Sequence, residues 1–174
     1  MMSNPDTLAR HLRNGGFLVL ADKSGAWLLA NPRNPQALET AAAGAVLPLT
    51  KGFVLIGAMD RLYEYVQRFP DLAWDIAEGS EKALLIWYEG GKGVPAAMLD
   101  DKGWVGVMLN RCKPLQALLE KLGHGLLCLP LAGAGEGWQA LPDVLPLPSD
   151  PGLRLAPERI MRLGIGGDVK FLKY

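Results

Sequence analysis

One lysine stands where a loop meets an apolar segment that has the pattern of a buried strand. Lys51 follows the proline-bearing loop at Pro48, and the next residues, Phe53 to Ile56, are all bulky and apolar. This run lies between Gly52 and Gly57, and a short apolar run between glycines predicts a strand covered on both faces. A lysine at the mouth of such a strand either binds a ligand or belongs to a solvated loop.

The other side chains able to do chemistry are few. His11 and His124 are the only histidines, and without a nucleophile elbow near either of them a hydrolytic triad has little support. We expect His11 on the surface side of a helix and His124 in a turn before a strand. Cys112 and Cys128 form no CxxC pair, so no metal site is predicted, and apolar neighbours would raise the pKa of the Cys128 thiol and blunt its reactivity.

Two glycine-rich stretches fail as phosphate-binding motifs. Residues 133–137 read Gly-Ala-Gly-Glu-Gly, which lacks the spacing of a dinucleotide fingerprint, and Pro142 cuts off the helix that should follow. Residues 91–93 read Gly-Lys-Gly and lack the frame of a P-loop. Neither stretch by itself predicts a nucleotide site.

Length and composition limit the class of protein. The chain has 174 residues, 49% of them hydrophobic, which suits one domain over residues 1–174 with a sizeable core. The formal net charge is zero, so strong general attraction to nucleic acid is not expected. No apolar run approaches the ~20 residues of a membrane span. The N-terminal residues 1–13 are polar without a signal-peptide core. We therefore expect a soluble cytoplasmic protein with no membrane partner.

Strand and helix patterns alternate along the chain, which predicts an α/β domain with a mixed sheet. An asparagine followed by Pro5 signals the first helix start, and Pro35, Asp60 and Pro114 signal others. Helices are expected over 5–14, 35–44, 60–66, 70–78, 114–122 and 158–163. Strands are expected over 16–21, 26–30, 53–56, 83–88, 94–99, 104–109, 126–131 and 168–174. The glycine- and proline-rich stretch from 132 to 151 is expected to be loop.

The order of these segments resembles the YrdC/TsaC-like family of threonylcarbamoyl-AMP synthases in its short single-domain form. Residues 15–24 resemble the family's first strand and proline-threonine-glutamate turn, and residues 48–57 resemble its K-x-R-P-x-x-K loop with the strand that follows. Residues 106–114 resemble a strand ending in G-V-R-V, 123–135 a strand ending in S-T-S-A-N-x-S-G, and 154–169 the C-terminal R-L-x-P-S-x-I segment. The resemblance implies a twisted mixed sheet flanked by helices, with a concave binding face.

The polar residues of the family pattern are mostly replaced. In the K-x-R-P loop, Pro48 and Lys51 match, whereas Ala45 and Leu47 stand where the resemblance expects a lysine and an arginine. Met108 stands in the place of the arginine of G-V-R-V. Of the later loop only Gly135 matches. The other replacements are Ala21, Asp22 and Lys23 in the first turn, and Cys128, Leu129, Pro130 and Ala132 in the later loop.

These replacements imply a change of function. In the family, the two loops bind ATP phosphates, bicarbonate and threonine, and losing one such donor typically costs ~10²–10³ in rate. We expect a divergent YrdC-like protein without synthase activity that binds a nucleotide, a small molecule or RNA weakly in the concave cleft. The residues expected to line that cleft are Lys51, Asp22, Lys23, Ser24 and Gly135. The apolar replacements Leu47, Met108, Leu129 and Pro130 are expected to line the same pocket and to disfavour a triphosphate.

Two alternatives stay open. The first is an active nucleotide-dependent enzyme of tRNA modification that uses ATP and Mg²⁺, with compensating cations from the set Arg111, Lys113, Arg154 and Arg159. The second is a non-catalytic subunit, a homo-oligomer or the partner of another protein, whose tryptophans and leucine-rich loops form an interface. The most basic stretch, with Arg154, Arg159, Arg162, Lys170 and Lys173, is interpreted as solvated surface.

Overall fold

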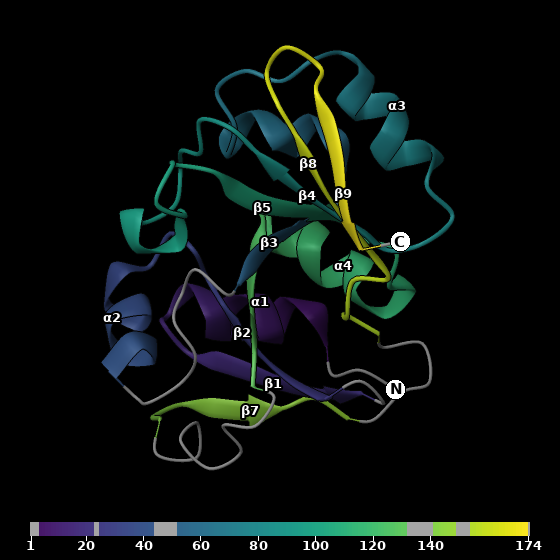
Figure 1. Ribbon diagram of the computed structural model, residues 1–174. Coiled ribbons are helices and arrows are strands. Elements are labelled where there is room, and N and C mark those ends of the chain that lie inside the picture. Colours follow the sequence, from purple (N-terminus) through teal and green to yellow (C-terminus); the bar gives the residue numbers. More distant parts are fainter. Residues whose placement is uncertain (1–3, 23–24, 44–51, 132–140, 149–153, 174) are drawn as a thin grey trace.

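The computed structural model describes residues 4–22, 25–43, 52–131, 141–148 and 154–173. They form one nine-stranded mixed sheet with helices on both faces (Figure 1). The helices are α1 (Pro5–Arg13), α2 (Pro35–Ala43), α3 (Leu72–Gly79) and α4 (Lys113–Leu122), with short 3-10 helices η2 (Met59–Glu64) and η3 (Ala96–Met98). The strands are β1 (Phe17–Asp22), β2 (Gly25–Ala30), β3 (Phe53–Ile56), β4 (Leu84–Tyr88), β5 (Val105–Leu109), β6 (Leu126–Pro130), β7 (Val144–Pro146), β8 (Arg159–Leu163) and β9 (Val169–Lys173).

Strand order fixes which ends of the strands meet. The order is β7-β1-β2-β6-β3-β5-β4-β8-β9. β6 runs antiparallel to both β2 and β3, whereas β3 and β5 are parallel. The C-terminal end of β6 therefore lies beside the start of β2 and the start of β3, while the C-terminal ends of β3 and β5 lie at the opposite end of the sheet.

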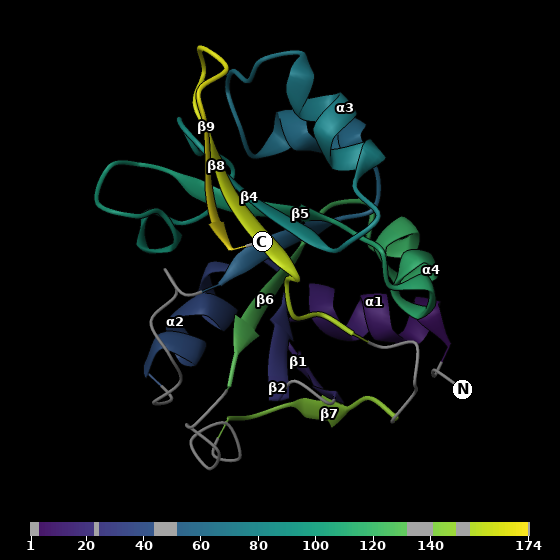
Figure 2. The same ribbon diagram turned by 45° about the vertical axis from the view of Figure 1, so that its right-hand side comes forward.

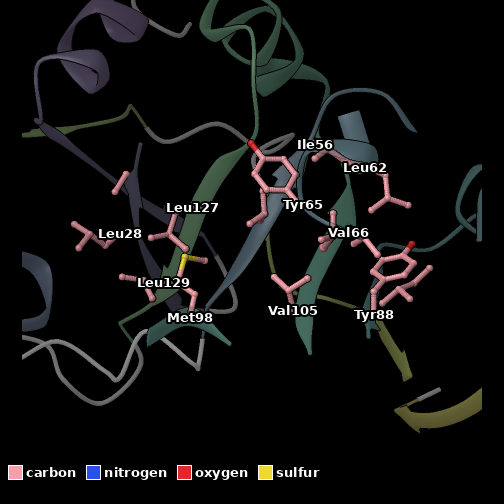
Figure 3. Close-up of a cluster of buried hydrophobic side chains, with 14 of the residues drawn as sticks. Leu28, Ile56, Leu62, Tyr65, Val66, Tyr88, Met98, Val105, Leu127 and Leu129 are labelled. Carbon is pink, nitrogen blue, oxygen red and sulfur yellow. The ribbon is translucent and has the colours of Figure 1, made fainter. Parts of the chain in front are cut away.

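Each face of the sheet has its own hydrophobic core. On one face α1 packs beside α4, and their leucines cover alternate residues of the central strands, such as Leu55 and Leu126. On the other face, residues of α2, η2 and α3 cover the intervening positions, such as Val54 and Leu127. Figure 2 separates α2 from the α1/α4 pair on opposite sides of the sheet, and Figure 3 shows part of the α2-side core, with Leu28, Tyr65 and Leu129 pointing into it. Successive residues of 53–56 point alternately into the two cores, which explains why all four are apolar.

The first and fourth helices form as the sequence predicts. Asn4 Oδ1 accepts a hydrogen bond from Asp6 N at 2.8 Å, and Pro5 occupies the first turn, where its missing N–H costs nothing. Helix α4 ends at Gly123, which has a φ of 80°. A residue with a side chain would adopt this conformation only with strain. The side chain of Arg13 reaches from α1 to the carbonyl oxygen of Lys121 near the end of α4.

Four sequence-based predictions of local structure are wrong. Residues 159–163 form strand β8, not a helix, because they pair with β4 on one side and β9 on the other. Residues 94–99 contain 3-10 helix η3 and no strand, and the helix expected at 60–66 is the 3-10 helix η2. Residues 144–146 form a strand within the expected loop, parallel to β1.

His11 is also placed differently from the prediction. Its ring is partly buried, and Nε2 lies 2.8 Å from the carbonyl oxygen of Asp143 and 3.1 Å from that of Phe17. It thus joins α1 to the segment that leads into β7. None of the helices in the described part of the chain is long and apolar enough to cross a membrane.

Candidate functional site

The strands bring the predicted site segments to one end of the sheet. Trp27 of β2 pairs with Pro130 of β6, and Phe53 of β3 pairs with Cys128. Leu131 N donates to the carbonyl oxygen of Ala26 at 2.8 Å, which holds the chain after β6 against the start of β2. The end of β1 and the starts of β2 and β3 therefore lie at the same end of the sheet as the end of β6. We define this region as the β6 end.

Of the five predicted binding residues, the structure describes one, Asp22. Lys23, Ser24, Lys51 and Gly135 lie outside the described residues. Asp22 is the last residue of β1 and pairs with Gly25. The roles of these residues stay predictions.

The described part of the β6 end is apolar and closely packed. Cys128 is fully buried among residues packed under α1 and α4, and burial, with a smaller contribution from Cys112, raises the pKa of its thiol. Leu129 is equally inaccessible but points into the opposite core. Gly52 lies against both: a Cβ atom there would lie 2.6 Å from Leu129 Cδ2 and 2.8 Å from the Cys128 carbonyl oxygen. A side chain at position 52 would therefore meet β6.

The expectation of one pocket lined by Met108 and Leu129 is wrong. Met108 is 2% exposed and belongs to the core under α1 and α4, whereas Leu129 lies in the core on the other face. The two side chains are separated by the sheet itself. Leu47, the third expected member of that pocket, lies outside the described residues.

One buried polar atom beside the β6 end has no partner among the described residues. Trp27 is 7% exposed, its ring packs edge-on against Phe53 at 5.6 Å, and its indole Nε1 has no hydrogen-bond partner there. A buried unpaired donor is costly, so this N–H marks an unsatisfied polar group in the core beside the β6 end. Sequence reasoning missed it, because a tryptophan within an apolar strand has the same pattern as an ordinary core residue.

Three of the four cations proposed to compensate for lost loop charges lie away from the β6 end. Arg111 follows β5, at the opposite end of the sheet, and donates to the carbonyl oxygens of Ala77 and Glu78 at 2.8 Å, where it caps α3. Lys113 begins α4 at that same opposite end. Arg159, at the start of β8, stacks over the Phe171 ring at 4.8 Å. Arg154 is exposed.

A small polar pocket of about 170 Å³ lies at the opposite end of the sheet from the β6 end. Gly57, Gln116 and His124 are among its lining residues. The His124 ring is 7% exposed, its Nδ1 lies 2.7 Å from the carbonyl oxygen of Gly125, and burial lowers its pKa. Gln116 Nε2 donates to the carbonyl oxygen of Gly57, so Gln116 and His124 both already have structural partners.

No metal centre is found within the described ranges, where no three His, Cys, Asp or Glu side chains gather closely enough to hold an ion.

Solved structures with the same arrangement of strands and helices decide the fold. E. coli YciO superposes with a TM-score of 0.72 at 18% identity, covering 97% of this chain and 87% of YciO. The fold is YrdC-like. Neither a protein-family model nor a curated protein sequence matches the chain.

Two larger proteins contain the same YrdC-like domain. P. abyssi Sua5 matches with a TM-score of 0.73 at 13% identity over 92% of this chain, which spans about half (53%) of Sua5. Full-length HypF, solved in a phosphate- and nucleotide-bound form, matches with a TM-score of 0.71 at 16% identity over 97% of this chain and 28% of HypF. At these identities the structural likeness confirms the predicted fold. Any activity has to be argued from the residues of this chain.

Proposed function

We propose that this chain is a YrdC-like binding protein that does not synthesise threonylcarbamoyl-AMP. Its ligand would be a nucleotide, a small molecule or RNA, bound weakly at the β6 end. The likeness to HypF in a nucleotide-bound form and to Sua5, a structure of which contains L-threonine, supports this class of ligand. The proposal is that this chain, which shares its fold with HypF and Sua5, also binds its ligand in the same region of the fold, but with different side chains.

The observation that carries the proposal is the chemistry of β6. Where the resemblance expects hydroxyls, the described residues are Cys128, Leu129 and Pro130, two of them fully buried and the third without an N–H. Stabilising the charge of a transferring or leaving phosphate requires positioned donors or cations. These three side chains supply neither, because a neutral buried thiol and two apolar groups cannot bind an anion.

The loss of arginine at Met108 supports the same conclusion. An arginine there would have to bury its charge under α4, where the neighbours of Met108 are Leu55, Leu85 and Leu115 in the same core. An unpaired charge in such surroundings is expensive. The packing around this position is thus adapted to an apolar residue.

The binding half of the proposal is tested by calorimetric titration of the purified chain with ATP, AMP, L-threonine and a short tRNA stem, each at constant ionic strength. We expect dissociation constants in the high micromolar to millimolar range for one of the nucleotide-containing ligands. The matched pair Lys51→Gln and Lys113→Gln separates the β6 end from general charge, because Lys113 is a cation at the opposite end of the sheet. Absence of binding by every ligand at millimolar concentration would contradict the proposal.

A second candidate function, that of an interaction subunit, has one specific observation in its favour. Leu72, Ile165 and Val169 are 38%, 39% and 44% exposed, and a Cβ on Gly167 would lie 3.6 Å from Leu72 Cδ2. A side chain at Gly167, in the turn between Ile165 and Val169, would thus contact Leu72, which puts the β8–β9 turn beside α3. Exposed apolar patches mark interfaces. Light scattering decides this candidate: a dimer that Val169→Ser dissociates would support it, and a monomer at all concentrations would contradict it.

A further inference from the structure

A second pocket, of about 330 Å³, lies between the turn before β5 and the β8–β9 hairpin. Strands β3 and β5 separate β4, which ends at this pocket, from β6. The pocket is therefore distinct from the β6 end, and the inference below does not depend on the proposed function. Three cations line it, and they come from three different places: Lys102 from the turn, Arg162 from β8 and Lys170 from β9.

The register of the sheet explains why two of these cations face the same way. Gly106, Trp87, Arg162 and Lys170 lie side by side across β5, β4, β8 and β9. Trp87 packs against the core under α1 and α4, so Arg162 and Lys170 project on that same face of the sheet. Gly164 also lines the pocket, and a Cβ there would lie 3.0 Å from Glu89 Oε1. A glycine at this point leaves the pocket open.

The guanidinium of Arg162 is held in position before any ligand arrives. Its Cζ lies 4.4 Å from the centre of the Trp104 ring, and its Nη2 lies 3.5 Å from Asp100 Oδ2. Asp100 is itself fixed, because its Oδ1 accepts hydrogen bonds from Lys102 N and Trp104 N, each at 2.9 Å. An arginine stacked on an aromatic ring loses little further freedom when it binds a ligand.

The same guanidinium keeps most of its hydrogen-bonding capacity. The contact with Asp100 is an ion pair, and within the described part of the chain no acceptor makes a hydrogen bond to Arg162. Its side chain is 33% exposed, so the remaining N–H groups can be reached from solvent. A guanidinium with a free edge matches the two oxygens of a carboxylate or phosphate.

Carboxylates as well as cations surround the pocket. Glu89 and Asp168 also line it, but Glu89 Oε1 accepts a hydrogen bond from Ile165 N at 2.9 Å and so holds the hairpin turn. With Asp100 paired to Arg162, three carboxylates balance the three cations, so recognition of an anion rests on the directed N–H groups of Arg162 and not on net charge. The complementary ligand is a small anion that reaches Arg162 while staying clear of Asp168.

We propose that this pocket binds a compact oxyanion, a carboxylate or a phosphate, through the guanidinium of Arg162, with Lys102 and Lys170 as flanking cations. The ligand sits against the edge of the Trp104–Arg162 stack. The basic stretch near the C-terminus is thereby a binding element and more than solvated surface.

The test follows the indole N–H signals of ¹⁵N-labelled protein during titration with malonate and, separately, with inorganic phosphate at constant ionic strength. The Trp104 signal, assigned through Trp104→Phe, is expected to shift saturably with at least one of the two anions, and the one that saturates at lower concentration identifies the preferred geometry. The buried Trp27 signal is expected to stay in place. A shift that sodium chloride reproduces, or no saturable shift with either anion, overturns the proposal.

A matched pair of variants separates binding from packing. Arg162→Gln removes the proposed ligand contact, whereas Arg159→Gln removes an arginine from the same strand that is stacked on Phe171 outside the pocket. We expect Arg162→Gln to weaken anion binding about tenfold or more, the usual loss for a hydrogen bond to a charged group, and Arg159→Gln to leave it unchanged. Equal effects overturn the proposal. If Arg162→Gln does not fold, the exposed Lys170→Gln is used, and unchanged affinity in that variant is equally contradictory.

Discussion

Met108 and Leu129 lie on opposite faces of the sheet, although the resemblance places polar binding residues at both positions. Met108 packs under α1 and α4, and Leu129 packs in the core shared with α2 and η2 (Figure 3). Neither side chain lines an open cleft, since they are 2% and 0% exposed. The replacements at these positions therefore complete two cores.

Restoring the expected cation at position 108 should damage the fold. Met108→Arg would bury a charge without a partner, which we expect to lower the free energy of unfolding by about 3 kcal/mol or more. Met108→Leu keeps the volume and should cost less than about 1.5 kcal/mol. Urea denaturation of both variants measures the difference. Equal stability of the two variants would mean that position 108 faces an open cleft.

The approach of Gly52 to β6 predicts a second stability effect. Gly52→Ala places a Cβ 2.8 Å from the Cys128 carbonyl oxygen, so backbone must shift, and overpacking of this kind costs about 1–3 kcal/mol. Gly79→Ala is the control, because a Cβ at the end of α3 meets nothing within 4 Å. We expect that control to be neutral or stabilising by up to about 1 kcal/mol. A neutral Gly52→Ala would show that the start of β3 is not packed against β6.

Tyr65 should contribute to stability through one buried hydrogen bond. Its Oη accepts a bond from Gly125 N at 2.6 Å, and the side chain is 1% exposed. Tyr65→Phe leaves that N–H unpaired, at an expected cost of about 1–3 kcal/mol in the free energy of unfolding. Tyr63→Phe changes a side chain that is 58% exposed and should have no measurable effect. Equal losses of unfolding free energy for Tyr65→Phe and Tyr63→Phe in chemical denaturation would contradict a stabilising role of the Tyr65–Gly125 hydrogen bond.

The same residue predicts how stability changes at alkaline pH. Burial raises the pKa of Tyr65 from 10.0 to about 12, so the folded protein favours the neutral phenol. The stability that the neutral Tyr65 phenol contributes is fully present below pH 10, which is the pKa of a tyrosine in the unfolded chain. It is lost as the pH rises from 10 toward about 12. Tyr65→Phe should lose less stability over this interval than the unchanged protein. Parallel pH profiles of the two proteins would contradict the prediction.

Cys128 should be unreactive in the folded protein. It is completely buried, and burial raises the pKa of its thiol, so little thiolate forms at neutral pH. In a Cys112→Ser background, we expect maleimide labelling at pH 8 to proceed only at the rate of unfolding. Labelling within minutes under native conditions, faster than hydrogen exchange of the β6 amides, would instead indicate an accessible nucleophile.

The sequence predicted the elements whose signals are local. The proline and asparagine at the start of α1, and the glycine after α4, act within one turn of the chain, so those helices were predicted with nearly correct bounds. β8 was mistaken for a helix because Pro157 resembles a helix start, while its strand form depends on pairing with Leu84–Tyr88, far away in the chain. β7 has three residues and is defined only by its pairing with β1.

The candidate site was less predictable, for a related reason. Which core a strand residue enters depends on the register between strands, so the sequence could not separate Met108 from Leu129. The unpaired indole of Trp27 and the Trp104–Arg162 stack also depend on tertiary contacts. Lys23, Ser24, Lys51 and Gly135 lie outside the described residues, so their proposed roles depend on the binding experiments above.

The central claim is that the YrdC-like fold is present without threonylcarbamoyl-AMP synthesis. It is tested most directly by pyrophosphate release from ATP in the presence of Mg²⁺, bicarbonate and L-threonine, with an active synthase as positive control and threonine omitted as blank. We predict a rate indistinguishable from the blank, because the described end of β6 offers only Cys128, Leu129 and Pro130 where phosphate chemistry requires donors. Threonine-dependent pyrophosphate release with multiple turnovers would contradict the account.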